Sequence, residues 1–445
     1  MGVFIAAALL FASCGGGGNG GEEQPTPDGP VTIKVWHSMP SLAEGVIKRM
    51  AMEFNESQSQ YQVELIFQGS YSDSLNKLIA STAENVPNVI QLSDASTQIM
   101  IDSAPITPVQ EFIDAEGFDL SDFEPKAISY YTVGDTLYSM PFNLAGPILY
   151  YDRGAFEDAG LDPDQPPKTL DEVRAYSEQI VQSAAEGEER TGIALVVSAW
   201  YFEQMLAKDG ALYVDGENGR DGRATEAMFS AEAGTEIIEW WGGMVADGLA
   251  YNAGGDTLDA MFKLASGETA MVIASTAALR GAIAAMTIAG LDVNQYDAAA
   301  MPGQDGAGGG IVLGGASFWI LSDPPSFEQQ GAWEFLKFAS STEQQARWHV
   351  DTGYFPSRVS SLSEPIVVEA WKQFPQFEVA LQQLHDSPDT AATRGVLLGP
   401  LNEIREEVVK AFERVLAGGA DPAEALQDAA EEANEIMDDY NRTAP

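Results

Sequence analysis

The side chains that most often do chemistry in proteins are few and widely separated in this sequence. It has one cysteine, Cys14, and three histidines, His37, His349 and His385. One thiol cannot form a disulfide within the chain. A thiolate zinc site or a Cys–His nucleophile pair needs more of these groups, closer together, than the sequence provides. The remaining candidates are carboxylates, of which Asp and Glu supply 67.

These carboxylates do not form a recognisable catalytic pattern. Glycoside hydrolysis needs two carboxyl groups at a defined separation across the scissile bond, and no motif in the sequence places such a pair. The sequence therefore predicts no catalytic residue, no metal site and no cofactor. A carbohydrate-active enzyme remains a remote alternative, which turnover of a chromogenic glycoside would support. A surface adhesin is a second remote alternative.

Basic residues are scarce, and this restricts the partners of the chain. The 23 Lys and Arg residues against 67 acidic ones give a formal net charge of −44 at pH 7. Such a chain is repelled by the phosphates of nucleic acids and by anionic lipid, so we expect no nucleic acid partner. We interpret the surplus of acid as the solvated, self-repelling surface of a soluble monomer. At 445 residues, 45% of them hydrophobic, the chain has room for two globular lobes.

The start of the sequence predicts export. Residues 3–12 form an apolar run that is too short to span a membrane but suits the hydrophobic region of a signal peptide. The run ends in Phe11-Ala12-Ser13-Cys14, which resembles a bacterial lipobox with Phe11 in place of the usual Leu. Residues 15–30 are rich in Gly, Pro and Glu, as in a flexible tether. We expect a signal peptide at 1–14, lipidation at Cys14, a linker at 15–30 and a body held at the outer face of a membrane.

The body begins with alternating strands and helices. Apolar spacing predicts strands at 31–36, 61–67 and 88–92, and helices at 41–57 and 72–84. This order favours a parallel sheet with right-handed crossovers. In such sheets the ligand crevice lies beyond the carboxyl ends of the strands. The residues that follow these strands are therefore candidates for a site, and they include Tyr71 and Asp94.

The rest of the body continues as a mixed α/β chain. Extended segments at 137–143 and 147–151 are expected to cross between lobes, and apolar segments at 270–274 and 310–321 to return. Thr169 and Glu172 form a capping box that opens a long helix. A helical end is predicted from Asp421, which is followed by Pro in the first turn.

Several motifs in this body together resemble a known family, the family 1 extracellular solute-binding proteins of ABC importers. They are Trp36-His37-Ser38-Met39, Pro141-Phe142-Asn143, Leu149-Tyr150-Tyr151, Ala159-Gly160-Leu161-Asp162-Pro163, Gly314-Gly315-Ala316-Ser317 and Thr352-Gly353-Tyr354. The resemblance covers the chain from about Val31 onward. It implies two α/β lobes of the periplasmic-binding-protein type II fold, joined by a hinge, with the ligand cleft between them. The expected division assigns 31–140 and 276–322 to the first lobe, and 141–275 and the helical segment 323–445 to the second.

The resemblance also implies a set of ligand contacts. By position these are Tyr71, Asp94, Ala145, Trp200, Ser275, Gly315, Tyr354 and Arg405. The family pattern has Glu at the position of Asp94 and Ser at that of Ala145. An arginine fork such as Arg405 suits a phosphate or carboxylate, and we expect its truncation to weaken phosphate binding with little effect on the stability of the empty protein.

Most of these residues also have an alternative structural role. Arg405 could pair with Glu406 or Glu407 on its own helix. Asp94 and Ser275 could cap helices, and Gly315 could serve a tight turn. Tyr71, Tyr354 and Trp200 could belong to the core.

The function that the resemblance implies is ligand capture for import. A lipoprotein of this kind would bind glycerol-3-phosphate or a glycerophosphodiester and deliver it to an ABC permease in the membrane, closing by hinge motion near Asn143, Ser275 and Leu321. Because Ala145 lacks the family's hydroxyl, an oligosaccharide-binding protein of a carbohydrate importer is kept as the alternative.

The predicted anchor can be tested directly. If Cys14 carries the lipid, the Cys14→Ser variant loses its acyl chains and is expected to move from the membrane fraction to the soluble fraction. Fractionation followed by immunoblotting would measure this. Unchanged membrane partition would contradict the lipoprotein assignment.

Overall fold

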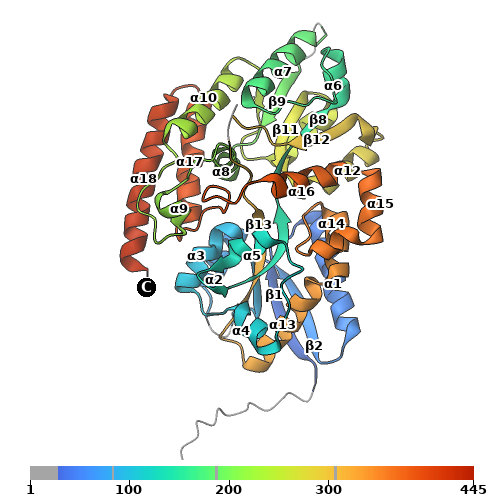
Figure 1. Ribbon diagram of the computed structural model, residues 1–445, viewed down its shortest axis with the longest axis vertical. Helices are drawn as coiled ribbons and strands as arrows, with labels where there is room; N and C mark the ends of the chain where they lie inside the picture. Colours follow the sequence, from blue (N-terminus) through green and yellow to red (C-terminus); the bar gives the residue numbers. More distant parts are fainter. Residues whose placement is uncertain (1–28, 83–84, 186–188, 305–307, 445) are drawn as a thin grey trace, which may run out of the picture.

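The computed structural model describes residues 29–82, 85–185, 189–304 and 308–444. The predicted signal peptide, Cys14 and most of the predicted linker lie outside these residues. Figure 1 shows two lobes, each built around its own β-sheet. Within the described residues, no helix is both long enough and apolar enough to cross a membrane.

The first sheet contains the strands predicted at the start of the body. β1 (Val31–His37) pairs in parallel with β2 (Tyr61–Phe67) and β3 (Val89–Ser93), as the alternation of strands and helices predicts. A later strand, β13 (Gly314–Leu321), runs antiparallel beside β3. It also pairs with β4 (Ile106–Thr107) and β7 (Met140–Ala145).

Amphipathic helices cover this sheet. α1 (Ser41–Ser57) buries Val46, Ile47, Met50 and Phe54 at helical spacing. α2 (Tyr71–Ile79) begins at a capping box formed by Ser70 and Asp73. The other helices of this lobe are α3 (Thr97–Ser103), α4 (Val109–Glu116), α5 (Pro125–Tyr131), α13 (Ser326–Ala339) and α14 (Thr342–Thr352).

The second sheet has the strand order β10-β9-β11-β8-β12. Its strands are β8 (Pro147–Asp152), β9 (Thr191–Leu195), β10 (Ala250–Asn252), β11 (Thr269–Ser275) and β12 (Tyr296–Ala300). β9 is parallel to β10 and β11, whereas β8 is antiparallel to β11 and β12. Residues before β8 belong to the first lobe, so the first crossing lies at 145–147.

Helices surround the second sheet as well. The predicted capping box of Thr169 and Glu172 opens α7 (Leu170–Ser183), and Asp421 caps α18 (Pro422–Thr443). The remaining helices include α8 (Ala199–Lys208), α9 (Asp215–Gly219), α10 (Glu232–Ala246), α11 (Thr257–Ser266), α12 (Leu279–Ile288), α16 (Gln376–Asp386) and α17 (Leu401–Leu416). In Figure 1, α18 runs along the side of the second lobe and ends near α3 of the first, where Tyr440 Oη donates to Asp102 Oδ2 at 2.9 Å.

The strand pairings correct the expected division into lobes. Residues 276–322 were assigned to the first lobe and 323–445 to the second. The structure pairs β12 with β8 in the second sheet, and it packs α13 against β1 and α14 against α1 in the first lobe. The reason is that apolar spacing identifies a strand or helix but not the sheet that it joins. The chain therefore returns to the first lobe between β12 and β13.

The two strands nearest this crossing approach each other closely. Gly315 in β13 has φ +119°, and a Cβ atom there would lie 2.0 Å from the backbone oxygen of Asn143 in β7. Glycine is required here by backbone conformation and by space together. The predicted ligand contact Gly315 thus has a structural role in the packing of the hinge strands.

This close approach predicts a loss of stability. Gly315→Ala is expected to lower the free energy of unfolding by about 1–3 kcal/mol from backbone strain alone, with the overlap on Asn143 adding to it. Chemical denaturation would measure the change. Gly281→Ala is the matched control, because Gly281 lies in α12 with nothing within 4 Å of a new Cβ atom, and alanine is expected to stabilise a helix. Equal stability of wild type and Gly315→Ala would contradict the packing role.

Candidate ligand-binding site

A buried ion pair lies between the lobes. Arg405 in α17 donates from Nε to Glu203 Oε1 at 2.7 Å and from Nη2 to Glu203 Oε2 at 2.6 Å. Glu203 belongs to α8, so both partners come from the second lobe. The Arg405 side chain is 18% exposed and that of Glu203 is 8% exposed. This is the planar two-bond contact that arginine makes with carboxylates.

A third charged group reaches the pair from the first lobe. Asp94, directly after β3, places Oδ2 3.9 Å from Arg405 Nη2. Burial raises the pKa of Asp94, and the nearby Glu203 adds to this, while the Arg405 charge opposes it. Burial works to lower the pKa of Arg405, but Glu203 and then Asp94 raise it overall. The guanidinium is therefore held charged, with one carboxylate bound to it and a second close by.

Two hollows meet at this cluster. The inner one is a cavity of about 10 Å³, enough for a single water molecule. The outer one is an open pocket of about 440 Å³, within the usual size range of small-molecule sites. Arg405 and Trp200 line both hollows and form the wall between them, whereas Asp94 and Glu203 line only the inner cavity.

The linings of the two hollows differ in character. The inner cavity also contacts Tyr130, Leu206, Ala207, Ala211, Tyr213, Asn218, Val312, Ala392, Val396 and Leu401. The other residues of the outer pocket are Ser72, Ser198, Ala199, Asn402, Glu406, Val409 and Lys410. The outer pocket is therefore bounded by α2 of the first lobe and by α8 and α17 of the second.

Helix α8 fixes the positions of its side chains. Ser198 caps the helix by accepting from the Trp200 backbone N–H at 3.3 Å, and Glu203 follows one turn after Trp200. Gln204 then bonds both backbone groups of Val312, donating to its oxygen at 3.0 Å and accepting from its N–H at 2.9 Å. These bonds attach α8 to the chain segment that returns to the first lobe.

Sequence reasoning missed Glu203. The available signal was its spacing from Trp200, because residues three apart share a helix face. That signal was weak in a chain with 67 acidic residues. The predicted partners of Arg405, Glu406 and Glu407, make no ion pair with it in the described structure; Glu407 instead pairs with Lys410.

The two predicted tyrosines meet at a second polar cluster, in the first lobe. Asn143 Nδ2 donates to Tyr71 Oη at 3.0 Å, and its Oδ1 accepts from Gln91 Nε2 at 2.6 Å. Burial raises the pKa of Tyr354 to about 12, and Asn143 bonding opposes this rise. Asn143 was expected only at the hinge, yet it bonds Tyr71 and lies near Tyr354.

His349 holds the segment that carries Tyr354. Its Nδ1 donates to the Tyr354 carbonyl oxygen at 2.7 Å, and its Nε2 accepts from Trp371 Nε1 at 2.8 Å. Burial lowers the pKa of His349 to about 4, so the ring is neutral at pH 7. The Tyr354 ring stacks on Trp348 at 5.6 Å between centroids. His349 thus holds the backbone of Tyr354 in place.

The remaining predicted contacts lie on the strands between the lobes. Ser275 Oγ accepts from the backbone N–H of Ala277 at 3.2 Å and caps a 3-10 turn, as the alternative interpretation proposed. Ala145 is buried and pairs with Gly314. Trp200 in turn lies against Gly314, since a Cβ atom there would be 2.8 Å from the indole.

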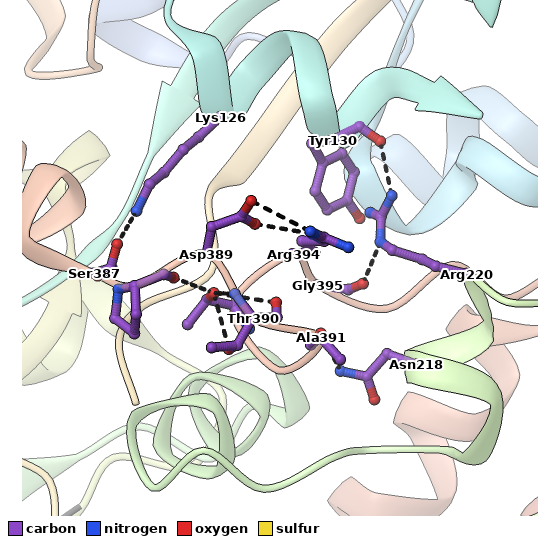
Figure 2. A network of polar contacts seen from close by, with 12 residues as sticks. Lys126, Tyr130, Asn218, Arg220, Ser387, Asp389, Thr390, Ala391, Arg394 and Gly395 are labelled. Atoms are coloured by element: carbon purple, nitrogen blue, oxygen red, sulfur yellow. Dashed lines mark hydrogen bonds and ion pairs between the residues drawn. The ribbon is translucent and has the colours of Figure 1, made fainter. Parts of the chain in front are cut away.

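A loop after α16 joins the lobes beside the inner cavity (Figure 2). Lys126 of α5 donates to the carbonyl oxygen of Ser387 at 2.5 Å. Arg220, from the second lobe, donates to Gly395 O at 2.7 Å and to Tyr130 O at 3.3 Å, with its guanidinium 4.7 Å from the Tyr130 ring. Tyr130 of the first lobe is thereby fixed where it lines the cavity.

A metal site is not part of this arrangement. In the part of the chain that the structure describes, no group of three or more His, Cys, Asp or Glu side chains is placed to hold a metal ion. The chemistry available at the cluster is hydrogen bonding, charge and aromatic contact.

Residues 49–376 match the family described as bacterial extracellular solute-binding protein. The sn-glycerol-3-phosphate-binding periplasmic protein UgpB of Rhizobium meliloti (strain 1021) is 33% identical over 406 residues, covering 90% of this chain and 92% of that protein.

Solved structures share the two-lobed fold. UgpB from Mycobacterium tuberculosis in complex with glycerophosphocholine has a TM-score of 0.78 at 22% identity and covers 94% of this chain and 100% of that chain. The GacH receptor of Streptomyces glaucescens, solved unliganded and with acarbose, has a TM-score of 0.76 at 17% identity and covers 92% of this chain and 99% of that chain. The expected family and fold are confirmed: the chain belongs to the bacterial extracellular solute-binding proteins, here in their two-lobed α/β form.

Proposed function

We propose that this protein captures a glycerol phosphate ester, either glycerol-3-phosphate or a glycerophosphodiester, for an ABC importer. The observation that carries the proposal is Arg405, a buried guanidinium at the wall of a pocket of about 440 Å³ between the lobes. In a chain with a net charge of −44, a cation at this position is the feature that an anionic ligand requires. Relatives that bind sn-glycerol-3-phosphate support the same ligand class.

The outer pocket offers further groups for such a ligand. Ser72 comes from the first lobe, and Asn402 and Lys410 from α17 of the second. Their hydroxyl, amide and ammonium groups suit phosphate and hydroxyl oxygens. The Trp200 ring offers an apolar face to the carbon chain of glycerol. A ligand that contacts both walls would stabilise the closed arrangement of the lobes.

Closure is proposed to occur about the strands between the lobes. The chain crosses at 145–147 and again between β12 and β13. The first crossing lies beside two of the expected hinge positions, Asn143 and Ser275. Leu321, the third, lies at the far end of β13, where it pairs with Ile106. The permease would recognise the closed form. Lipidation at Cys14 would hold the protein beside that permease.

A neutral sugar is the second candidate ligand. It is favoured by the bond between Arg405 and Glu203, because a guanidinium that already holds a carboxylate offers less to a phosphate. Asp94 and Glu203 could accept bonds from sugar hydroxyls, and Ala145 lacks the hydroxyl of the family pattern. The GacH receptor, solved with acarbose, shows that the fold accommodates sugars.

Native mass spectrometry of freshly purified protein, followed by calorimetry, tests the ligand class. Titration with sn-glycerol-3-phosphate, with glycerophosphoglycerol and with maltose compares the candidates. The expected result is that one or both phosphate esters bind and that maltose does not bind. Binding of maltose alone would replace the proposal with the sugar alternative.

Arg405→Ala is expected to weaken binding of the phosphate ester roughly 30-fold to several thousand-fold, because one partner of a desolvated charge contact is lost. Arg405→Lys keeps the charge but loses the fork and should fall between. Unchanged affinity in Arg405→Ala, measured by calorimetry, would contradict the role of Arg405.

The ion pair revises the expected effect of this variant on stability. Removing Arg405 leaves Glu203 buried without its partner, so the empty protein should lose about 3–5 kcal/mol of unfolding free energy rather than almost none. The double variant with Glu203→Gln should recover much of that stability but not the binding. Chemical denaturation of both variants separates the two effects.

A further inference from the structure

We infer that Glu203 is a specificity-determining residue, which excludes phosphate monoesters and leaves a phosphodiester with a hydroxylated second alcohol as the ligand. This inference rests on the proposed function and narrows its ligand class. Three observations carry it: the bonds made by the Arg405 fork, the balance of charge at the cluster, and the position of the larger pocket.

The first observation is that the arginine fork is already occupied. Nε and Nη2 of Arg405 each donate to one oxygen of Glu203. Glu203 takes the Nε–Nη2 edge of the guanidinium, so a phosphate can make a two-bond contact only at the other edge, through Nη1 and the second N–H of Nη2. Nη1 of Arg405 makes no hydrogen bond to any residue in the described part of the chain. This remaining edge lies close to a second acid, because Asp94 Oδ2 is 3.9 Å from Nη2, so a phosphate bound there meets the Asp94 carboxylate as well as the guanidinium.

Glu203 is also held firmly in place. Its side chain is 8% exposed, and its helix begins at the Ser198 cap. The next residue, Gln204, is bonded to both backbone groups of Val312. Rotation of Glu203 away from Arg405 would leave a buried carboxylate without a partner, which is costly.

The second observation is the balance of charge. One guanidinium faces two carboxylates, those of Glu203 and Asp94. A phosphate monoester carries about −1.5 to −2 at pH 7. The cluster holds no second cation for the additional charge, and Lys410 in the outer pocket is already paired with Glu407. A diester carries a single negative charge. In a partly desolvated cleft, like charges at short range are strongly unfavourable, and the diester is favoured.

The third observation is space. The inner cavity beside Glu203 holds about one water molecule, whereas the outer pocket measures about 440 Å³. A phosphate that contacts Arg405 from the outer side therefore has room for a substituent on a second ester oxygen. With a monoester bound, this part of the outer pocket would be filled by water instead.

The outer pocket also indicates the chemistry of the second alcohol. Its polar lining includes Ser72, Asn402 and Lys410, and among the described residues Trp200 is the only aromatic one that lines it. Quaternary ammonium groups are recognised by several aromatic faces together. Hydroxyl and amide groups instead suit an alcohol that carries hydroxyl groups, such as a second glycerol or a sugar alcohol.

Calorimetry with sn-glycerol-3-phosphate and glycerophosphoglycerol tests the inference on wild type, Glu203→Gln and Glu413→Gln. Glu413 is an exposed acid on α17, outside both hollows, and it controls for the change in net charge. Wild type and Glu413→Gln should prefer the diester by about tenfold or more. Glu203→Gln should bind the monoester about tenfold more tightly and lose most of that preference.

The pH dependence of wild-type binding gives a second test, which does not need a stable variant. The monoester loses its second charge on protonation near a pKa of about 6. Its affinity relative to the diester should therefore rise between about pH 7.5 and about pH 5. The diester serves as the reference, because titration of Asp94 or any other protein group affects both ligands.

The outcomes separate the inference from the proposed function. Equal affinities for both phosphate esters in wild type, or an unaltered preference in Glu203→Gln, would overturn the role of Glu203 while leaving phosphate ester capture intact. Binding of maltose and of neither phosphate ester would overturn both. A ratio of monoester to diester affinity that does not change with pH would also contradict the charge argument.

Discussion

The bond between Arg405 and Glu203 is the constraint on which the cleft depends. A buried guanidinium needs a partner for its charge, and here the Glu203 carboxylate supplies one through two hydrogen bonds. The pair holds α8 against α17, and Asp94 brings the end of β3 to the same point. Trp200 and Gln204 occupy the same helix as Glu203, so the aromatic wall and the attachment to Val312 follow from the placement of this one ion pair.

Contacts between the lobes fall into two groups with different consequences for closure. One group consists of the strands β7, β8 and β13, which lead into and out of the crossings and of which β7 and β13 need Gly315 for their close packing. The other consists of side chains that reach across, as in Figure 2, where Lys126 and Arg220 attach α5 and Tyr130 to the loop after α16. The chain segments that cross between the lobes stay connected in any motion of the lobes. The hydrogen bonds of Lys126 and Arg220, in contrast, must break or move together with one lobe. In the proposed closure, the side of the cleft near Tyr130 would therefore resist opening.

Local patterns predicted most of the elements, and long-range contacts account for what was missed. The strands at 31–36 and 61–67 and the caps at Thr169 and Asp421 follow from spacing and turn chemistry, and the structure contains them. The sheet that β12 joins depends on partners far away in the chain, and the sequence pattern of residues 296–300 does not record them. For the same reason the alternative structural role of Arg405 considered only neighbours on its own helix, whereas its partner Glu203 lies 202 residues away. Ser275 and Gly315 show the reverse case, since both match the family pattern yet serve the local backbone.

Because the whole chain is acidic, recognition of an anionic ligand would depend on short-range contacts. A surface with a net charge of −44 repels anions in solution, but exposed charges are screened beyond about 8 Å at physiological ionic strength. An anionic ligand that enters the cleft therefore feels mainly the groups that it touches. At that range the arrangement of charge matters more than its sum, because a guanidinium facing two carboxylates is neither a bare cation nor a neutral donor. The same arginine can serve a phosphate or a hydroxyl, and the carboxylate bound to it determines which of the two gains more.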